Sequence, residues 1–105
     1  MNHEISVREL KEALDAGLDV TFLDVRESWE HAYVHFTGAL HIPLGQLGAR
    51  LQEIQPDKLH VIYCHTGVRS LNATRALAAR GYNVRSLRGG IDLWAQEIDP
   101  TLPRY

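Results

Sequence analysis

The sequence contains a single cysteine and lacks any long apolar run. One cysteine among 105 residues cannot form an internal disulfide bond, so we expect a chain that works in a reducing compartment, with the cytoplasm as the default. The amino-terminal residues show no basic stretch followed by an apolar one, and no apolar run approaches the length of a membrane-spanning helix. We therefore expect neither a secretion signal nor a membrane partner.

A strong charge of either sign is also lacking. The formal net charge at pH 7 is -2, which gives no electrostatic basis for binding nucleic acid or an anionic membrane. Hydrophobic residues make up 45% of the chain, as in ordinary globular proteins. A chain of this length can bury one core, so we expect a single domain over residues 1–105 and a monomer.

What the chain does contain is an alternation of β-prone and helix-prone segments. Runs of β-branched and aromatic residues alternate with runs whose apolar residues recur at helical spacing. We predict strands at 20–26, 59–63 and 84–87, helices at 7–16, 28–32, 44–54, 70–80 and 91–98, an irregular connection at 36–43 and an irregular, surface-lying tail at 99–105. This alternation predicts an α/β fold with a mostly parallel sheet and helices on both faces. Ligands in such folds bind at the carboxyl ends of the strands.

Local signals mark several helix ends. Ser6 and Glu9 have the spacing of a capping box, and Ser28 is placed to cap the short second helix. Gly45 and Gly48 weaken the prediction of a helix at 44–54. Gly89 and Gly90 are expected to form a turn before the last helix.

The only cysteine, Cys64, follows directly on the strand at 59–63 and precedes the helix at 70–80. The first N–H groups of a helix lack intrahelical partners and carry partial positive charge, so an anion is favoured there. With the guanidinium of Arg69 closing the loop, this setting favours the thiolate form of Cys64 and predicts a nucleophile. The alternative is a buried, inert cysteine that packs as a small hydrophobe.

Four residues separate Cys64 from Arg69, and Gly67 can supply the backbone angles that turn successive N–H groups inward. Such a loop can hold one small anion. Two reactions use a cysteine thiolate in this setting, namely attack on phosphorus and attack on a sulfane sulfur.

The loop Cys64–Ser70 resembles the active loop of rhodanese-type sulfurtransferases. Further segments match that family's other signatures in order and spacing: Asp24-Val25-Arg26-Glu27, His35, Gly38-Ala39, Ile42-Pro43, Leu87-Arg88-Gly89-Gly90-Ile91 and Trp94. The resemblance implies a mostly parallel five-stranded sheet with helices on both faces. It also implies that Cys64 takes a sulfane sulfur from a donor such as thiosulfate and passes it to a thiophilic acceptor such as cyanide or a thiol, without a cofactor.

The resemblance assigns roles within the loop. The backbone N–H groups of His65, Thr66, Gly67, Val68, Arg69 and Ser70 would cradle the persulfide anion. Arg69 would stiffen the loop and supply charge rather than a proton, since guanidinium does not deprotonate in proteins. Ser70 would either donate its hydroxyl or cap the helix. His65 stands where many family members carry a permanent cation, and it either binds substrate or forms a solvated loop tip.

Two other functions remain open. The first is a sulfur-carrier or regulatory module that acts only with a protein partner, such as a thioredoxin-like or other sulfur-relay protein. The second is a small phosphatase or arsenate reductase, whose related loops carry five residues between cysteine and arginine. The loop here is shorter by one residue, or up to about 3.3–3.6 Å of contour, which favours a single sulfur over a tetrahedral phosphate. A phosphatase would also need an acid, for which Asp24 or Glu27 could serve.

Arg26 and the histidines are secondary candidates. Arg26 would either bind an anionic donor at the rim of the site or pair with Asp24 or Glu27, and we favour the pair. His31, His35 and His41 raise the question of a metal site, but we favour a structural role and predict no metal.

Overall fold

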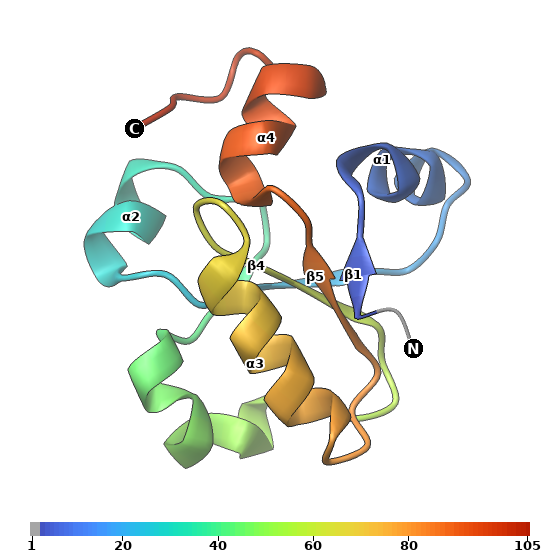
Figure 1. Ribbon diagram of the computed structural model, residues 1–105, viewed down its shortest axis with the longest axis vertical. Helices are drawn as coiled ribbons and strands as arrows, with labels where there is room; N and C mark the ends of the chain where they lie inside the picture. Colours follow the sequence, from blue (N-terminus) through green and yellow to red (C-terminus); the bar gives the residue numbers. More distant parts are fainter. Residues whose placement is uncertain (1–2) are drawn as a thin grey trace.

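The computed structural model describes residues 3–105 and shows a sheet covered by helices on both faces (Figure 1). The strands are β1 (Glu4–Ile5), β2 (Thr21–Asp24), β3 (Leu40–His41), β4 (His60–Tyr63) and β5 (Val84–Leu87). The helices are α1 (Val7–Asp15), α2 (Ser28–Tyr33), the 3₁₀ segment η1 (Leu44–Glu53), α3 (Val68–Ala78) and α4 (Gly90–Glu97).

The five strands lie in the order β1-β5-β4-β2-β3, and every neighbouring pair is parallel. The predicted α/β class with a mostly parallel five-stranded sheet is thus confirmed. The strand β4 lies in the centre, paired with β2 on one side and β5 on the other. Its carboxyl end therefore lies between two other strand ends, where α/β folds place their ligands.

The central strand is buried on both faces. Val61 and Tyr63 pack into one apolar cluster, which α1 and α4 complete, while Ile62 and Cys64 pack into a second cluster with η1 and α3. Successive side chains of a strand point to opposite faces, so the apolar run 61–64 supplies both cores. This alternation fixes Cys64 on the side of the sheet that α3 covers.

The helices α3 and α4 both begin near the loop that follows β4 (Figure 1). The chain beyond α4 then runs back toward α2. Within residues 3–105, no helix has the length and apolar character needed to cross a bilayer.

Several local predictions are confirmed and others need correction. The capping box of Ser6 and Glu9 forms as predicted. Ser28 does not cap α2, because Glu27 occupies that position and its backbone N–H donates to the Glu30 carboxylate. The segment 44–53 forms 3₁₀ turns with a kink at Arg50.

Two edge strands also differ from the prediction. The sequence gives no sign of β1, whose two residues pair with Ser86 and Leu87 of β5. The connection 36–43 contains the two-residue strand β3, which pairs with β2. Strands this short carry too few residues for an alternating pattern, and only their partners in the sheet define them.

Candidate active site

Cys64 lies at the carboxyl end of β4, and its residue surface is 1% exposed. The chain then turns through His65 and Thr66 to Gly67, the N-cap of α3, which has a left-handed φ of 110°. A Cβ on Gly67 would also lie 3.2 Å from the backbone nitrogen of Gly89. Both the backbone angle and the contact with the start of α4 favour glycine at this turn.

Two backbone N–H groups converge on the sulfur of Cys64. The N–H groups of Gly67 and Ser70 donate to Sγ over 3.1 and 3.4 Å. These groups belong to the first turn of α3, where N–H groups have no intrahelical acceptor. The sulfur therefore occupies a position that favours negative charge.

The hydroxyl of Ser70 lies beside the same sulfur. Its Oγ is 3.5 Å from Sγ, 3.2 Å from the carbonyl oxygen of Gly67 and 2.7 Å from the hydroxyl of Ser86. Both serines are fully buried. Ser86 comes from β5, and nothing in the local sequence pointed to it, because the contact depends on the neighbouring strand.

The amino-terminal end of α4 supports the active loop through hydrogen bonds to its backbone. The N–H groups of Ile91 and Asp92 donate to the carbonyl oxygens of Cys64 and His65 over 3.0 and 3.1 Å. A Cβ on Gly90 would lie 2.3 Å from the carbonyl oxygen of His65, and the φ of Gly90 is 64°. The expected glycine turn is thus the start of α4, where only glycine allows this close approach.

The guanidinium of Arg69 pairs with Glu30 of α2. Its Nη1 and Nη2 donate to Oε1 and Oε2 over 2.7 and 3.0 Å, and Glu30 is 3% exposed. Burial alone would raise the pKa of Glu30, but hydrogen bonds from Arg69 and Tyr105 outweigh it and lower the pKa to about 2. The loop arginine is therefore tied to α2 by a charged pair. The sequence reasoning missed Glu30, and its only local signal was its position in the first turn of a short helix.

Arg26 forms the structural pair that the sequence favoured. Its Nε and Nη2 donate to the two carboxylate oxygens of Asp24 over 2.9 and 2.7 Å, and both side chains are fully buried. Its Nη1 donates to the hydroxyl of Tyr105 over 2.9 Å. Arg26 is thus not an exposed rim residue, and its contact with Tyr105 is to a residue of the C-terminal tail.

The three candidate histidines form a stack. The ring of His31 lies between those of His35 and His41, with centroids 4.0 and 4.3 Å away. His31 Nδ1 is 2.8 Å from the carboxylate of Asp24, and His41 Nε2 is 2.9 Å from the carbonyl oxygen of Arg26. Among residues 3–105, no group of His, Cys, Asp and Glu side chains is arranged to hold a metal ion.

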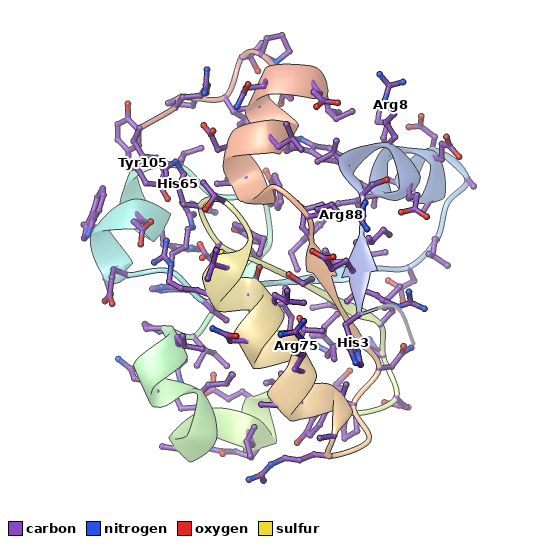
Figure 2. The ribbon with its side chains drawn as sticks, viewed as in Figure 1. His3, Arg8, His65, Arg75, Arg88 and Tyr105 are labelled. Atoms are coloured by element: carbon purple, nitrogen blue, oxygen red, sulfur yellow. The ribbon has the colours of Figure 1, made fainter. Side chains whose placement is uncertain are left out.

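His65 lies under the aromatic ring of Tyr105 (Figure 2). The two rings stack 4.1 Å apart at 15°, and the imidazole Nε2 is 3.9 Å from the Asp92 carboxylate. The tail 99–105 is irregular and lies on the surface, as predicted. The prediction did not include the contact of Tyr105 with the active loop, which this side chain makes while remaining 36% exposed.

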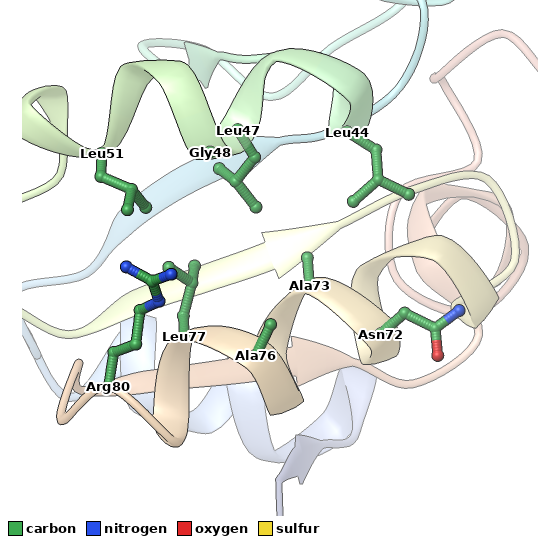
Figure 3. A pocket seen from close by; sticks show the side chains of 9 residues that line it. All are labelled: Leu44, Leu47, Gly48, Leu51, Asn72, Ala73, Ala76, Leu77 and Arg80. Carbon is green, nitrogen blue, oxygen red and sulfur yellow. The ribbon is translucent and has the colours of Figure 1, made fainter.

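A separate apolar groove of about 280 Å³ lies between η1 and α3 (Figure 3). Leucine and alanine side chains form most of its walls, and Arg80 lies at one end. Cys64 does not contribute to its lining. The groove therefore lies apart from the loop that carries the nucleophile candidate.

Comparison with known proteins places this geometry in a family. The model of the Rhodanese-like domain family matches residues 6–97. The putative sulfurtransferase YtwF of Bacillus subtilis is 33% identical over 97 residues, which cover 92% of this chain and 94% of YtwF. The probable adenylyltransferase/sulfurtransferase MoeZ of Mycobacterium tuberculosis is 38% identical over 104 residues, but the match spans only 26% of that longer protein.

A solved structure agrees with the sequence relatives. The human single domain sulfurtransferase TSTD1 superposes with a TM-score of 0.81 at 28% identity, covering 92% of this chain and 98% of TSTD1. The family match extends over most of the chain and includes β2, β4, α3 and β5, which build the Cys64 loop and its surroundings. The chain belongs to the rhodanese-like domain family.

Proposed function

We propose that this protein is a sulfurtransferase that receives a sulfane sulfur on Cys64 from a donor such as thiosulfate and passes it to cyanide or a thiol. The observation that carries the proposal is the convergence of the Gly67 and Ser70 N–H groups on Sγ, within a loop that has four residues between Cys64 and Arg69. The names of the relatives support the general activity.

The reaction needs two displacements at sulfur. In the first, the Cys64 thiolate attacks the outer sulfur of thiosulfate, a new S–S bond forms to Sγ, and the old S–S bond breaks so that sulfite leaves with its electron pair. In the second, cyanide or a thiolate attacks the terminal sulfur of the persulfide. The S–S bond to Sγ then breaks, the Cys64 thiolate is restored, and thiocyanate or a new persulfide leaves.

The loop is suited to both steps because negative charge lies on or next to Sγ throughout. The N–H groups that reach Sγ stabilise the thiolate before attack and after release. The hydroxyl of Ser70 adds a third polar contact, oriented by Ser86. The ion pair of Arg69 with Glu30 maintains the shape of the loop.

A sulfur-carrier role is the second candidate. The observation that favours it is the burial of Cys64 beneath a covered loop, which suits delivery to a specific partner. The name of MoeZ combines a sulfurtransferase with an adenylyltransferase, which agrees with transfer of the sulfur to a protein partner. In this case the persulfide would form but would not turn over with small acceptors.

A phosphatase or arsenate reductase is disfavoured by the loop length and by the pairing of Asp24 and Glu30. Asp24 binds Arg26 and His31, and Glu30 binds Arg69, so neither carboxylate is free to protonate a leaving oxygen. Glu27, the other candidate acid, is exposed at the start of α2, so only the loop length and the pairing of Asp24 and Glu30 count against this function.

Steady-state assays with two substrates test the proposal. We expect the wild-type protein to form thiocyanate from thiosulfate and cyanide, the Cys64→Ser variant to form none, and neither to hydrolyse p-nitrophenyl phosphate. Cys64-dependent phosphate release without thiocyanate would overturn the sulfurtransferase assignment. Persulfide formation without thiocyanate would favour the carrier role.

A further inference from the structure

The segment 101–105, called the strap below, returns from α4 to His65 of the active loop (Figure 2). Arg104 is its first anchor, since Nε and Nη2 donate to the Asp92 carboxylate over 2.8 and 3.3 Å. Tyr105 is the second anchor. Asp92 belongs to the first turn of α4 and donates its N–H to the carbonyl oxygen of His65, so the strap is fastened to the element that supports the loop.

Tyr105 connects α2 to the active loop. Its hydroxyl donates to Glu30 and accepts from Arg26, while its ring stacks on His65. Burial and the neighbouring Glu30 carboxylate raise the pKa of the phenol to about 12, so the hydroxyl keeps its proton at neutral pH. One side chain thus reaches from Glu30, the partner of Arg69, to the residue that follows Cys64.

More aromatic residues surround this contact. The rings of Trp29 and Tyr33 meet the ring of Tyr105 edge to face, with centroids 5.5 and 6.0 Å away. Trp29 and Tyr33 are nonetheless 63% and 54% exposed. Tyr105 therefore packs over the loop from an otherwise open aromatic surface on α2.

In the structure the strap is closed, with Tyr105 packed on His65, and two features weaken this closed arrangement. Beneath the strap, His65 Nε2 is buried and has no hydrogen-bond partner among residues 3–105, since the Asp92 carboxylate lies 3.9 Å away, and an unpaired buried nitrogen weakens this packed state. The Arg104 side chain is 54% exposed, so its ion pair with Asp92 is open to solvent and stabilises the closed strap only weakly. Displacing Tyr105 would expose His65 and open the side of the loop that faces α2.

We propose that Tyr105 is a specificity-determining residue of this site. With the strap closed, small thiophilic acceptors such as cyanide reach Cys64, whereas a bulky thiol such as glutathione must first displace the phenol ring from His65. The choice of acceptors rests on the sulfurtransferase function proposed above. The size limit itself is a property of the strap and holds for any reagent that reacts with Cys64.

Alkylation measures this size limit without any sulfur transfer. The reaction reports on Cys64 alone, because Cys64 is the only cysteine. The second-order rate constants of Cys64 with iodoacetamide and with fluorescein maleimide are measured for wild type, Tyr105→Phe and Tyr105→Ala. We expect the maleimide-to-iodoacetamide rate ratio to rise about tenfold in Tyr105→Ala, as loss of the aromatic stack predicts. Tyr105→Phe keeps the stack and loses both hydrogen bonds, so its ratio should rise by less.

The first anchor, Arg104, offers a matched pair of variants. Arg104→Ala removes the ion pair with Asp92 and should also raise the rate ratio, whereas Arg50→Ala removes the Arg50–Glu53 ion pair on η1 and should not. Circular dichroism confirms that each variant is folded. Equal ratios in wild type, Tyr105→Ala and Arg104→Ala would overturn the proposal.

Sulfur transfer then separates this inference from the proposed function. In Tyr105→Ala, kcat/KM for glutathione should rise relative to kcat/KM for cyanide. If the alkylation ratio shifts but no variant transfers sulfur, the size limit stands and the sulfurtransferase function is wrong. If wild type transfers sulfur but neither the alkylation ratio nor the acceptor ratio shifts in Tyr105→Ala, the function stands and the role of Tyr105 is wrong.

Discussion

Arg69 and Glu30 form a two-point ion pair between the active loop and α2, with N···O distances of 2.7 and 3.0 Å. The pair matches the fork geometry in which guanidinium binds carboxylate most strongly. Because Glu30 also accepts from the hydroxyl of Tyr105, one carboxylate joins the loop, α2 and the strap. The position of the loop therefore depends on the ionised state of Glu30.

Glu30→Gln should destabilise the protein in a pH-dependent manner. The pKa of Glu30 falls from 4.5 to about 2 on folding, so its charge stabilises the folded state above 4.5, and this contribution is lost as the pH falls toward 2. We expect Glu30→Gln to be less stable than wild type by about 1.5–3 kcal/mol at neutral pH, as for hydrogen bonds to charged groups. Urea unfolding should show this difference shrinking as the solution is acidified. The exposed pair of Glu53 with Arg50 provides the control, since Glu53→Gln should have a smaller effect. If the difference in unfolding free energy between wild type and Glu30→Gln persists undiminished in acid, the stabilising charge of Glu30 is contradicted.

Gly90→Ala should displace the active loop. The added Cβ would meet the carbonyl oxygen of His65 at 2.3 Å, and the positive φ adds strain, so we expect a loss of about 1–3 kcal/mol. Sulfurtransferase activity should fall with it. Gly45→Ala is the matched control, because nothing lies within 4 Å of its Cβ position and its φ is not positive. Thermal unfolding of both variants checks the prediction, which fails if the two are equally stable.

Ser70→Ala should slow the reaction of Cys64 at neutral pH. The variant loses the hydroxyl 3.5 Å from Sγ, which accepts from the Cys64 thiol and would have to rotate to donate to the thiolate. Ser86→Ala disturbs the same buried hydrogen bond of 2.7 Å but removes no atom in contact with the sulfur. Iodoacetamide alkylation rates should fall several-fold in Ser70→Ala and less in Ser86→Ala. The reverse order would show that Ser70 acts only in packing.

His65→Arg should lower the KM for thiosulfate. A permanent guanidinium next to Cys64 attracts a dianion and presents several N–H donors to its oxygen atoms. Arginine can also stack on Tyr105, so the strap contact survives the change. His65→Gln serves as the neutral control. Unchanged KM values in both variants would show that position 65 takes no part in binding the donor.

The sequence revealed those parts of the fold whose signals are local. The apolar run 61–63 predicts a buried strand, and the spacing of Ser6 and Glu9 predicts the start of α1. The strand β1 has two residues and no pattern of its own, so only its pairing with β5 defines it. Gly45 and Gly48 correctly weakened the helix prediction for 44–54, where the backbone instead forms 3₁₀ turns.

The residues of the candidate site also divide into those with a local sequence signal and those without one. Cys64, Gly67 and Ser70 lie within seven residues of the chain, so a loop of N–H groups around Sγ could be expected from the resemblance, while the structure directs those of Gly67 and Ser70 at the sulfur. Glu30 and Tyr105 reach the loop from α2 and from the segment after α4, and each looks like an ordinary surface residue in the sequence. Their roles arise from tertiary packing, which no local pattern encodes.

Intact-protein mass spectrometry after incubation with thiosulfate tests the central claim most directly. We predict that wild type gains the mass of one sulfur atom, that cyanide then removes it, and that Cys64→Ser gains nothing. The same sulfur adduct on Cys64→Ser, or wild type of unchanged mass, would contradict the claim that Cys64 carries the transferred sulfur.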